Sequence, residues 1–289
     1  MGNPSPGTLY IVSTPIGNLG DITVRAIDIL KNVDFVAAED TRHSKKLFAR
    51  YEISTPLISY YSAKEEVRAK EVMEKLSRGK RVALISDAGT PGISDPGYQL
   101  IRTSLNNGYK VITVPGPVAL ISALTLSGLP TARFVFEGFL PAKTGARRKR
   151  LESLKNEERT VIIYESPKRI WGTVNDIIRI FGDRDAAVAR ELTKIYEEVV
   201  RGKLSEIAEK LGEKPVRGEV TLIISGNAEK DKRHEIDIEG SISDILKNGY
   251  SVKDSALIAA EALGISKREA YQEILRLKRV RTGIAGKKL

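Results

Sequence analysis

The first third of the chain alternates short apolar runs with segments that carry helix signals. Runs rich in β-forming residues predict strands, and capping residues such as Thr23 and Ser62 predict helices between them. The expected strands are residues 9–12, 35–38, 81–85 and 110–114, and the expected helices are residues 23–30, 62–77 and 96–106. Strands that alternate with helices predict a largely parallel sheet covered by helices.

The pattern becomes less regular beyond Pro115-Gly116-Pro117, which we interpret as a domain boundary. Strands now follow one another with few helices between them, and a basic amphipathic helix opens at Arg147. The expected strands are residues 134–136, 160–164, 186–189, 196–201 and 219–224. Strands so close together along the chain predict a mixed or antiparallel sheet.

The last part of the chain is a polar, charged stretch followed by two helices with clear end signals. Ser251 and Ser266 stand at capping positions, and Gly264 can end the first helix in the left-handed conformation. Two helices joined by a Gly-containing turn are typical of a helix-turn-helix. The predicted domains are residues 1–116 and 117–227, followed by a linker at 228–240 and a helical domain at 241–289.

Composition excludes several classes of protein. The 289 residues include no Cys and only two His, which excludes disulfides and thiolate metal sites and argues against a zinc enzyme. The formal net charge of +10 favours a polyanionic partner. No apolar run is long enough to span a membrane and no signal-peptide pattern is present, so we expect a cytoplasmic protein.

Turns rich in small residues follow four of the expected strands, at residues 14–21, 39–43, 86–97 and 115–119. The chain has no GxxxxGK(S/T) phosphate loop, no GxGxxG after the first strand and no GxSxG nucleophile turn. In open α/β sheets, ligands bind outside the carboxyl ends of the strands. We therefore expect the four turns to converge on one crevice.

The turn at residues 86–97 gives the clearest indication of chemistry. Its small residues let a ligand approach the backbone closely. Asp87 and Asp95 lie at either end and the turn contains no lysine, so it suits a polar or cationic ligand better than a triphosphate. A tight connection that binds nothing would explain this turn alone, whereas four such turns favour a site.

Three polar segments are further candidates, each with a simpler explanation. Residues 39–42 contain two acids and a base, which an N-cap with a local ion pair would also explain. Residues 190–198 could be a solvated edge of the second sheet. The basic run at 147–150 could be a solvated helix start, or a second contact to a polyanion beside the basic tail.

The order of eight motifs resembles that of the tetrapyrrole-methylase-like methyltransferases, and more narrowly their branch that acts on ribosomal RNA. The motifs are TPIGNLGD, AEDTRHS, SDAGTPGISDPG, VPGPVALISAL, FEGFLP, YESPKRI, ARELTKIYEE and GEVTLII. The resemblance covers roughly residues 7–225. Other branches usually carry Gly-Asp-Pro where this chain has Ser86-Asp87-Ala88. The tail from about residue 241 resembles the small RNA-contacting domain of the same branch.

The resemblance implies an α/β fold with two methylase domains, one on a mostly parallel sheet and one on a mixed sheet, plus a small C-terminal helical domain. S-adenosylmethionine would bind in the cleft between the methylase domains, and such enzymes are typically homodimers. By analogy, the cofactor contacts are Pro15, Ile16, Asp87, Gly89, Thr90, Ala119 and Leu120 from the first domain, and Tyr164, Ala189 and the backbone near residues 218–220 from the second.

The implied reaction is 2′-O-methylation of a cytidine ribose in 16S ribosomal RNA, with the RNA or the small ribosomal subunit as partner and no metal. The attacking hydroxyl must lose a proton, which Asp40 or Glu197 could accept. Arg42 or Lys194 could hold the adjacent phosphate or lower the pKa of the hydroxyl. The expected RNA contacts are Arg147, Arg148, Lys149 and Arg150, together with Lys267, Arg268, Arg276 and Lys278 of a tail cluster that extends to Arg279 and Arg281.

Two alternatives stay open on the sequence alone. One is a methyltransferase that acts on a tetrapyrrole such as a precorrin or uroporphyrinogen. The other is a non-catalytic helix-turn-helix protein that binds nucleic acid. The basic charge and tail favour RNA over a tetrapyrrole, and the four strand-end turns favour an enzyme over a regulator.

Overall fold

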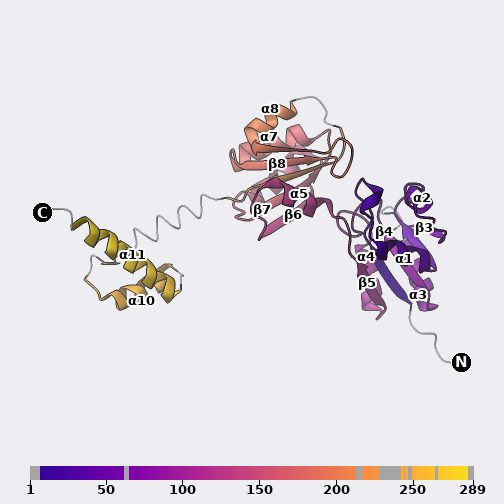
Figure 1. Cartoon of the computed structure of the whole chain (residues 1–289), viewed down its shortest axis with the longest axis horizontal. Helices are drawn as coiled ribbons and strands as arrows, with labels where there is room; N and C mark the ends of the chain where they lie inside the picture. Colours follow the sequence, from indigo (N-terminus) through magenta and orange to yellow (C-terminus); the bar gives the residue numbers. More distant parts are fainter. Residues whose placement is uncertain are drawn as a thin grey trace. The chain divides into compact units, whose positions relative to one another are not determined.

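The computed structural model describes residues 7–61, 65–212, 217–227, 242–243, 245–246, 249–263 and 266–285. Internal contacts divide the chain into two compact units, Met1–Gly226 and Asn227–Leu289 (Figure 1). The first unit holds two five-stranded sheets, and the second holds the helices of the tail.

Five parallel strands form the sheet that we call the N-terminal sheet, in the order β3-β2-β4-β1-β5. They are β1 (Thr8–Val12), β2 (Phe35–Ala38), β3 (Leu57–Ser59), β4 (Arg81–Ile85) and β5 (Lys110–Val114). The predicted parallel sheet is confirmed. The sequence did not predict β3, because a three-residue edge strand carries too short a pattern to differ from a loop.

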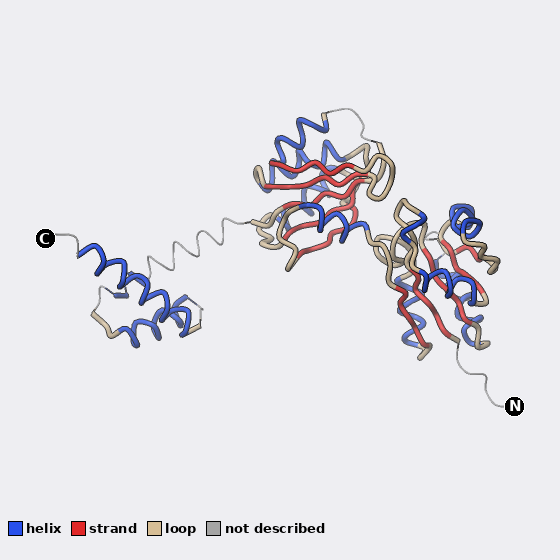
Figure 2. Tube along the Cα trace, viewed as in Figure 1, coloured by secondary structure: helices blue, strands red, loops and turns tan. Residues whose placement is uncertain are grey.

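Helices cover both faces of the N-terminal sheet (Figure 2). They are α1 (Val24–Asn32), α2 (Thr41–Arg50), α3 (Glu65–Ser77) and α4 (Tyr98–Asn106). A short 3-10 helix, η1 (Leu19–Asp21), follows β1 and buries none of its residues. In β4, Ala83 and Ile85 pack in the core with α1 and α2, whereas Val82 and Leu84 pack in the core with α3 and α4. Burial on both faces explains why these strands are continuously apolar.

The second sheet, which we call the C-terminal sheet, has the order β6-β7-β10-β8-β9. Its strands are β6 (Phe134–Phe139), β7 (Thr160–Glu165), β8 (Asp185–Arg190), β9 (Glu198–Lys203) and β10 (Val220–Ile224). Only β6 and β7 are parallel, so the predicted mixed sheet is confirmed. The strand expected at 196–201 begins instead at Glu198, because residues 191–197 form a hydrogen-bonded turn.

The helices of this half are α5 (Ala119–Ser127), α6 (Thr144–Leu154), α7 (Ile170–Phe181) and α8 (Leu204–Leu211). Buried residues of α6, α7 and α8 share one core with the sheet, and residues of α5 share another. Ile16 from the turn after β1 belongs to the core of α5. The two sheets are therefore joined by apolar packing as well as by the chain.

The tail contains α10 (Val252–Leu263) and α11 (Lys267–Ala285), which pack on a small core of their own. Ser266 and Glu269 form a reciprocal capping box with distances of 3.0 and 3.2 Å, as the sequence predicts. Gly264 and the linker at 228–240 lie outside the described residues. None of the described helices has the length and apolar character needed to cross a membrane.

Candidate active site

A short antiparallel bridge joins the turns that follow β1 and β4. The N–H of Thr14 donates to the carbonyl of Gly89 at 2.8 Å, and the N–H of Gly89 donates back at 3.0 Å. The hydroxyls of Ser13 and Thr90 form a hydrogen bond of 2.7 Å. Gly89 has a φ of +79°, which glycine adopts without steric cost. These contacts hold the two turns together at the carboxyl edge of the sheet.

The turns after β2 and β5 reach the same place. Oδ1 of Asp87, in the turn after β4, accepts a hydrogen bond from the N–H of Asp40 at 2.9 Å. Gly116 lies so close to the end of β1 that a Cβ there would be 2.9 Å from the Cβ of Ser13. The four strand-end turns come together as predicted, but residues 39–43 contribute nothing to the lining of the cavity described next.

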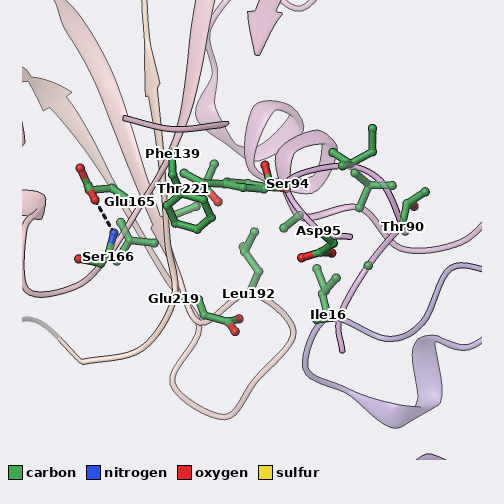
Figure 3. A pocket seen from close by; sticks show the side chains of 18 of the residues that line it. Ile16, Thr90, Ser94, Asp95, Phe139, Glu165, Ser166, Leu192, Glu219 and Thr221 are labelled. Atoms are coloured by element: carbon green, nitrogen blue, oxygen red, sulfur yellow. Dashed lines mark hydrogen bonds between the residues drawn. The ribbon is translucent and has the colours of Figure 1, made fainter. Parts of the chain in front are cut away.

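A cavity of about 340 Å³ opens where these turns face the carboxyl ends of β6, β7 and β8 (Figure 3). Its volume is typical of sites for small molecules. The N-terminal sheet and its turns contribute Ile16, Ala88, Gly89, Thr90, Ile93, Ser94, Asp95, Val118 and Ala119. The C-terminal half contributes Phe139, Tyr164, Glu165, Ser166, Pro167, Ala189, Leu192, Glu219, Val220 and Thr221.

Tyr164 joins the cavity wall to the start of α5. Its Oη accepts a hydrogen bond of 3.0 Å from the N–H of Leu120, in the first turn of α5. That helix has no capping side chain of its own at Val118, so Tyr164 satisfies one of its free N–H groups. Burial raises the pKa of Tyr164 to about 12, so the phenol keeps its proton at neutral pH.

The cavity is acidic. Asp95 and Glu219 line it, and burial together with the charges of Glu39, Asp87 and Glu219 raises the pKa of Asp95 to about 6. Burial also raises the pKa of Glu39. The residues described as lining the cavity include no Lys, Arg or His. Such a lining favours a cationic ligand and disfavours a phosphate.

The described part of the chain holds no group of three or more His, Asp or Glu side chains placed to bind a metal ion.

Comparison with known proteins identifies the family. Residues 8–208 match the family model of the tetrapyrrole (corrin/porphyrin) methylases. Ribosomal RNA small subunit methyltransferase I of Xylella fastidiosa is 46% identical over 270 residues, which cover 92% of this chain and 98% of that protein. The protein of the same name from Thermotoga maritima is 48% identical over 220 residues, which cover 76% of this chain and 99% of that protein. This chain belongs to the ribosomal RNA small subunit methyltransferase I family, a branch of the tetrapyrrole methylases.

Membership in this family of S-adenosylmethionine-dependent enzymes makes the chain a methyltransferase. The alternative of a non-catalytic nucleic-acid binder is thereby excluded. The sequence resemblance to the family, and the two-sheet fold that it implied, are confirmed.

Solved structures share the fold at low sequence identity. Uroporphyrin-III C-methyl transferase from Thermus thermophilus, complexed with S-adenyl homocysteine, is 20% identical with a TM-score of 0.56. The match covers 76% of this chain and 97% of that chain. A cobalt precorrin-4 methyltransferase is 18% identical with a TM-score of 0.57, over 75% of this chain and 94% of that chain.

Most of the cofactor contacts expected from the family lie at the cavity. Ile16, Gly89, Thr90, Ala119, Tyr164 and Ala189 line it. Pro15, Asp87 and Leu120 do not line it but are each next in sequence to a residue that does. Asp87 instead holds the backbone of Asp40, so its part in cofactor binding would be to position the turn. The assignment of these contacts stays a prediction.

Asp40 and Arg42, expected in catalysis, lie outside the cavity lining. Asp40 is the N-cap of α2, where its carboxylate accepts from the N–H of Arg42 at 2.8 Å and pairs with that guanidinium at 3.2 Å. Hydrogen bonds from Arg42 hold the pKa of Asp40 below its ordinary value. The local ion pair that was the simpler explanation of this cluster is present.

Lys194 and Glu197 also lie outside the lining but are close to it. The ammonium of Lys194 pairs with Glu191 at 2.8 Å and with the cavity residue Glu219 at 3.0 Å. The carboxylate of Glu197 accepts a hydrogen bond of 2.6 Å from the N–H of Thr193. Both side chains therefore stabilise the turn between β8 and β9.

The four basic residues at 147–150 on α6 differ in their burial. Arg147 is buried, and its guanidinium donates to Asp176 of α7 at 2.9 and 2.6 Å. Arg148, Lys149 and Arg150 are exposed. We correct the expectation for Arg147, since a guanidinium held inside the protein cannot reach a phosphate. The prediction of an RNA contact stays for the other three.

Other exposed basic side chains extend this picture. The tail residues expected to contact RNA, Lys267, Arg268, Arg276 and Lys278, are all exposed. The side chains of Arg279 and Arg281 lie outside the described residues. The sequence analysis missed α2, which contains no acidic residue and exposes Lys45, Lys46 and Arg50.

The sequence analysis also missed the cavity carboxylates as functional residues. Asp95 was noted only as one of two acids that suit the turn at 86–97 to a polar or cationic ligand, and Glu219 only within the backbone expected near the cofactor. Ser94 has a φ of +62°, uncommon for a residue other than glycine. Ser94 directly precedes Asp95, which lines the cavity. Sequence spacing alone could not have indicated this backbone conformation.

Proposed function

We propose that this chain transfers a methyl group from S-adenosylmethionine to the 2′-hydroxyl of a cytidine in small-subunit ribosomal RNA. Support for the RNA substrate comes from relatives at 42–48% identity that are named ribosomal RNA small subunit methyltransferase I. The net charge of +10 and the exposed basic residues of the tail suit the same polyanion.

The acidic cavity between the two sheets is the observation that carries the proposal. S-adenosylmethionine has a sulfonium and an ammonium group, and the carboxylate of Asp95 complements positive charge. The carboxylate of Glu219 already pairs with Lys194. The close backbone at Gly89 and the apolar side chains of Ile16 and Leu192 suit an adenosine that packs against the turns. When bound, the cofactor supplies a methyl group activated by its sulfonium.

Methyl transfer to a hydroxyl is an in-line displacement. The new bond from the ribose oxygen to the methyl carbon forms while the carbon–sulfur bond breaks, and S-adenosylhomocysteine leaves. The protein contributes by holding the three atoms in line and by excluding water, which is worth several orders of magnitude in rate. The apolar lining around Phe139 and Tyr164 serves this purpose.

The hydroxyl proton needs an acceptor as the oxygen attacks, and we propose Asp95. It lines the cavity, and its pKa of about 6 leaves it mostly ionised at neutral pH yet more basic than an ordinary carboxylate. Asp40 and Glu197 are engaged in a helix cap and in a turn, respectively. We therefore prefer Asp95 to the two acceptors that the sequence suggested.

The experiment is transfer of an isotopically labelled methyl group from S-adenosylmethionine to unmethylated small-subunit ribosomal RNA, both free and in the subunit. Uroporphyrinogen is the parallel substrate, because tetrapyrroles are the alternative within this fold. A single labelled nucleotide, resistant to alkali and mapped to a ribose by mass spectrometry, supports the proposal. Label on a base, on the tetrapyrrole, or on neither substrate contradicts it.

A further inference from the structure

Two large apolar side chains point into solvent from the turn at residues 191–197. Ile195 is 94% exposed and Tyr196 is 73% exposed. Single exposed apolar residues are common, but here two neighbours stand at the tip of a connection between β8 and β9. The hydrogen bonds, backbone conformation and position of the turn indicate why these two side chains are exposed.

Hydrogen bonds within residues 191–197 stabilise the turn. The N–H of Lys194 donates to the carbonyl of Glu191 at 3.0 Å, and the N–H of Glu197 donates to the carbonyl of Lys194 at 3.1 Å. The N–H of Thr193 donates to the carboxylate of Glu197 at 2.6 Å. The tip is therefore presented by an internally hydrogen-bonded turn.

Its backbone is also in an unusual conformation. Glu191 has a φ of +49° and Thr193 a φ of +66°, in the left-handed region that few residues other than glycine adopt. For a β-branched residue such as Thr193 this is a clear outlier. Backbone of this kind persists where surrounding contacts enforce it, and such positions cluster at functional sites.

The same turn borders the cavity. Leu192 lines it (Figure 3). Lys194 pairs with the cavity residue Glu219 at 3.0 Å. On the other side, Thr193 Oγ1 accepts a hydrogen bond from the N–H of Asn18 at 3.1 Å, which fixes the turn to the loop after β1. The exposed tip thus stands within a few residues of the cavity.

We propose that Tyr196 and Ile195 form a platform on which an unpaired base of the substrate RNA packs beside the reactive ribose. This inference rests on the proposed function, since it names how that substrate is held. Proteins that read unpaired RNA stack its bases on aromatic side chains, and every base offers a flat face. A ribose hydroxyl can enter the cavity only if its nucleotide leaves a regular helix, which leaves neighbouring bases free to stack.

A second copy of the chain is the competing occupant. Two side chains supply on the order of 300 Å² of contact, whereas a stable interface needs about 800 Å² from each partner. The position at the cavity, rather than on a broad apolar face, also favours the RNA. Dimerisation through this turn is therefore treated as an outcome of the test.

The test compares Tyr196→Ala, Tyr196→Phe and Ile195→Ala with the wild type in methyl transfer to unmethylated small ribosomal subunits. Loss of one stacked base raises the KM for the subunit roughly 5- to 100-fold in Tyr196→Ala. Tyr196→Phe keeps the ring and stays within about twofold of the wild type. Leu105→Ala removes another exposed apolar side chain, on α4, and serves as the matched control.

Two further measurements distinguish a loss of RNA binding from a loss of cofactor binding or of folding. Calorimetric titration with S-adenosylhomocysteine is expected to give the same Kd for all variants, and thermal unfolding the same Tm. A KM that is unchanged in Tyr196→Ala, with an active wild type, overturns the platform and leaves the proposed function intact. If light scattering gives a lower molecular mass for Tyr196→Ala than for the wild type, the tip is a contact between copies of the chain. That result also overturns the platform. A wild type that methylates no RNA removes the function and the platform together.

Discussion

At the scale of single residues, Asp95 combines two opposed effects. Burial next to other carboxylates disfavours its ionised form, which costs stability at neutral pH. The same environment makes the carboxylate a better proton acceptor. A residue that destabilises the fold yet lines the cavity is more readily explained by function than by packing.

Asp95→Asn is expected to lower kcat at least 100-fold while the Kd for S-adenosylhomocysteine changes by less than about threefold. The carboxylate must be ionised to accept a proton, so wild-type kcat/KM falls as pH drops through about 6. The exposed Asp28→Asn on α1 serves as control. An unchanged kcat in Asp95→Asn would show that Asp95 is not the proton acceptor and would favour Asp40 or Glu197.

Asp95→Asn is also expected to stabilise the protein at pH 7.5. The folded state binds the Asp95 proton more tightly than the unfolded chain, so the stability this group contributes is complete below pH about 4 and is lost as pH rises through about 6. Discounted for partial exposure, the gain is about 1–2 kcal/mol. Urea unfolding at pH 7.5 and pH 4 measures it, and a gain that persists undiminished at pH 4 would refute this explanation.

At the scale of elements, α6 shows how burial separates neighbouring residues of one type. Arg147 and Asp176 form a buried ion pair, whereas Lys149 is exposed on the same helix. Removing one member of a buried pair leaves an unpaired charge, but removing a surface lysine has little effect on stability.

We predict that Arg147→Ala destabilises the protein by about 3–5 kcal/mol. Lys149→Ala is expected to change the free energy of unfolding by less than about 0.5 kcal/mol. It should instead lower the log–log salt slope of RNA binding by roughly 0.7 to 0.9, the value of one phosphate contact. Chemical denaturation and RNA titrations at several salt concentrations measure the two effects. An unaltered slope would mean that α6 is only a solvated helix.

The sequence predicted those strands and helix caps that depend only on nearby residues. Buried strands such as β2 and β4 were found because both of their faces are apolar, and Thr23 was found as a cap because its hydrogen bond to Ala26 is local. The cap of α5 could not be found, since the hydroxyl that provides it belongs to Tyr164, 44 residues away. The four turns were predicted to meet, but which of Asp87 and Asp95 lines the cavity depends on backbone geometry and long-range contacts.

At the scale of the whole molecule, the two compact units have separate cores. The Thermotoga maritima relative is matched over 99% of its length by only 76% of this chain. Because the tail has its own core and exposes basic residues, we expect the first unit alone to bind the cofactor and the tail to add affinity for RNA.

A chain truncated after Gly226 is expected to bind S-adenosylhomocysteine with a Kd within about twofold of the full chain. Its affinity for small-subunit RNA should fall at least tenfold, and its salt slope by 0.7 to 0.9 for each phosphate contact that the tail makes. Calorimetry and filter binding measure the two constants. Equal RNA affinity in both chains would show that the tail has another role.

The most direct measurement is a crystal structure of the full chain saturated with S-adenosylhomocysteine. Our account predicts the ligand in the cavity between the two sheets, against Gly89, Ala119 and Ala189, with its sulfur facing Asp95. A ligand bound elsewhere, with this cavity empty at saturation, would contradict the central claim that the strand-end turns hold the methyl donor.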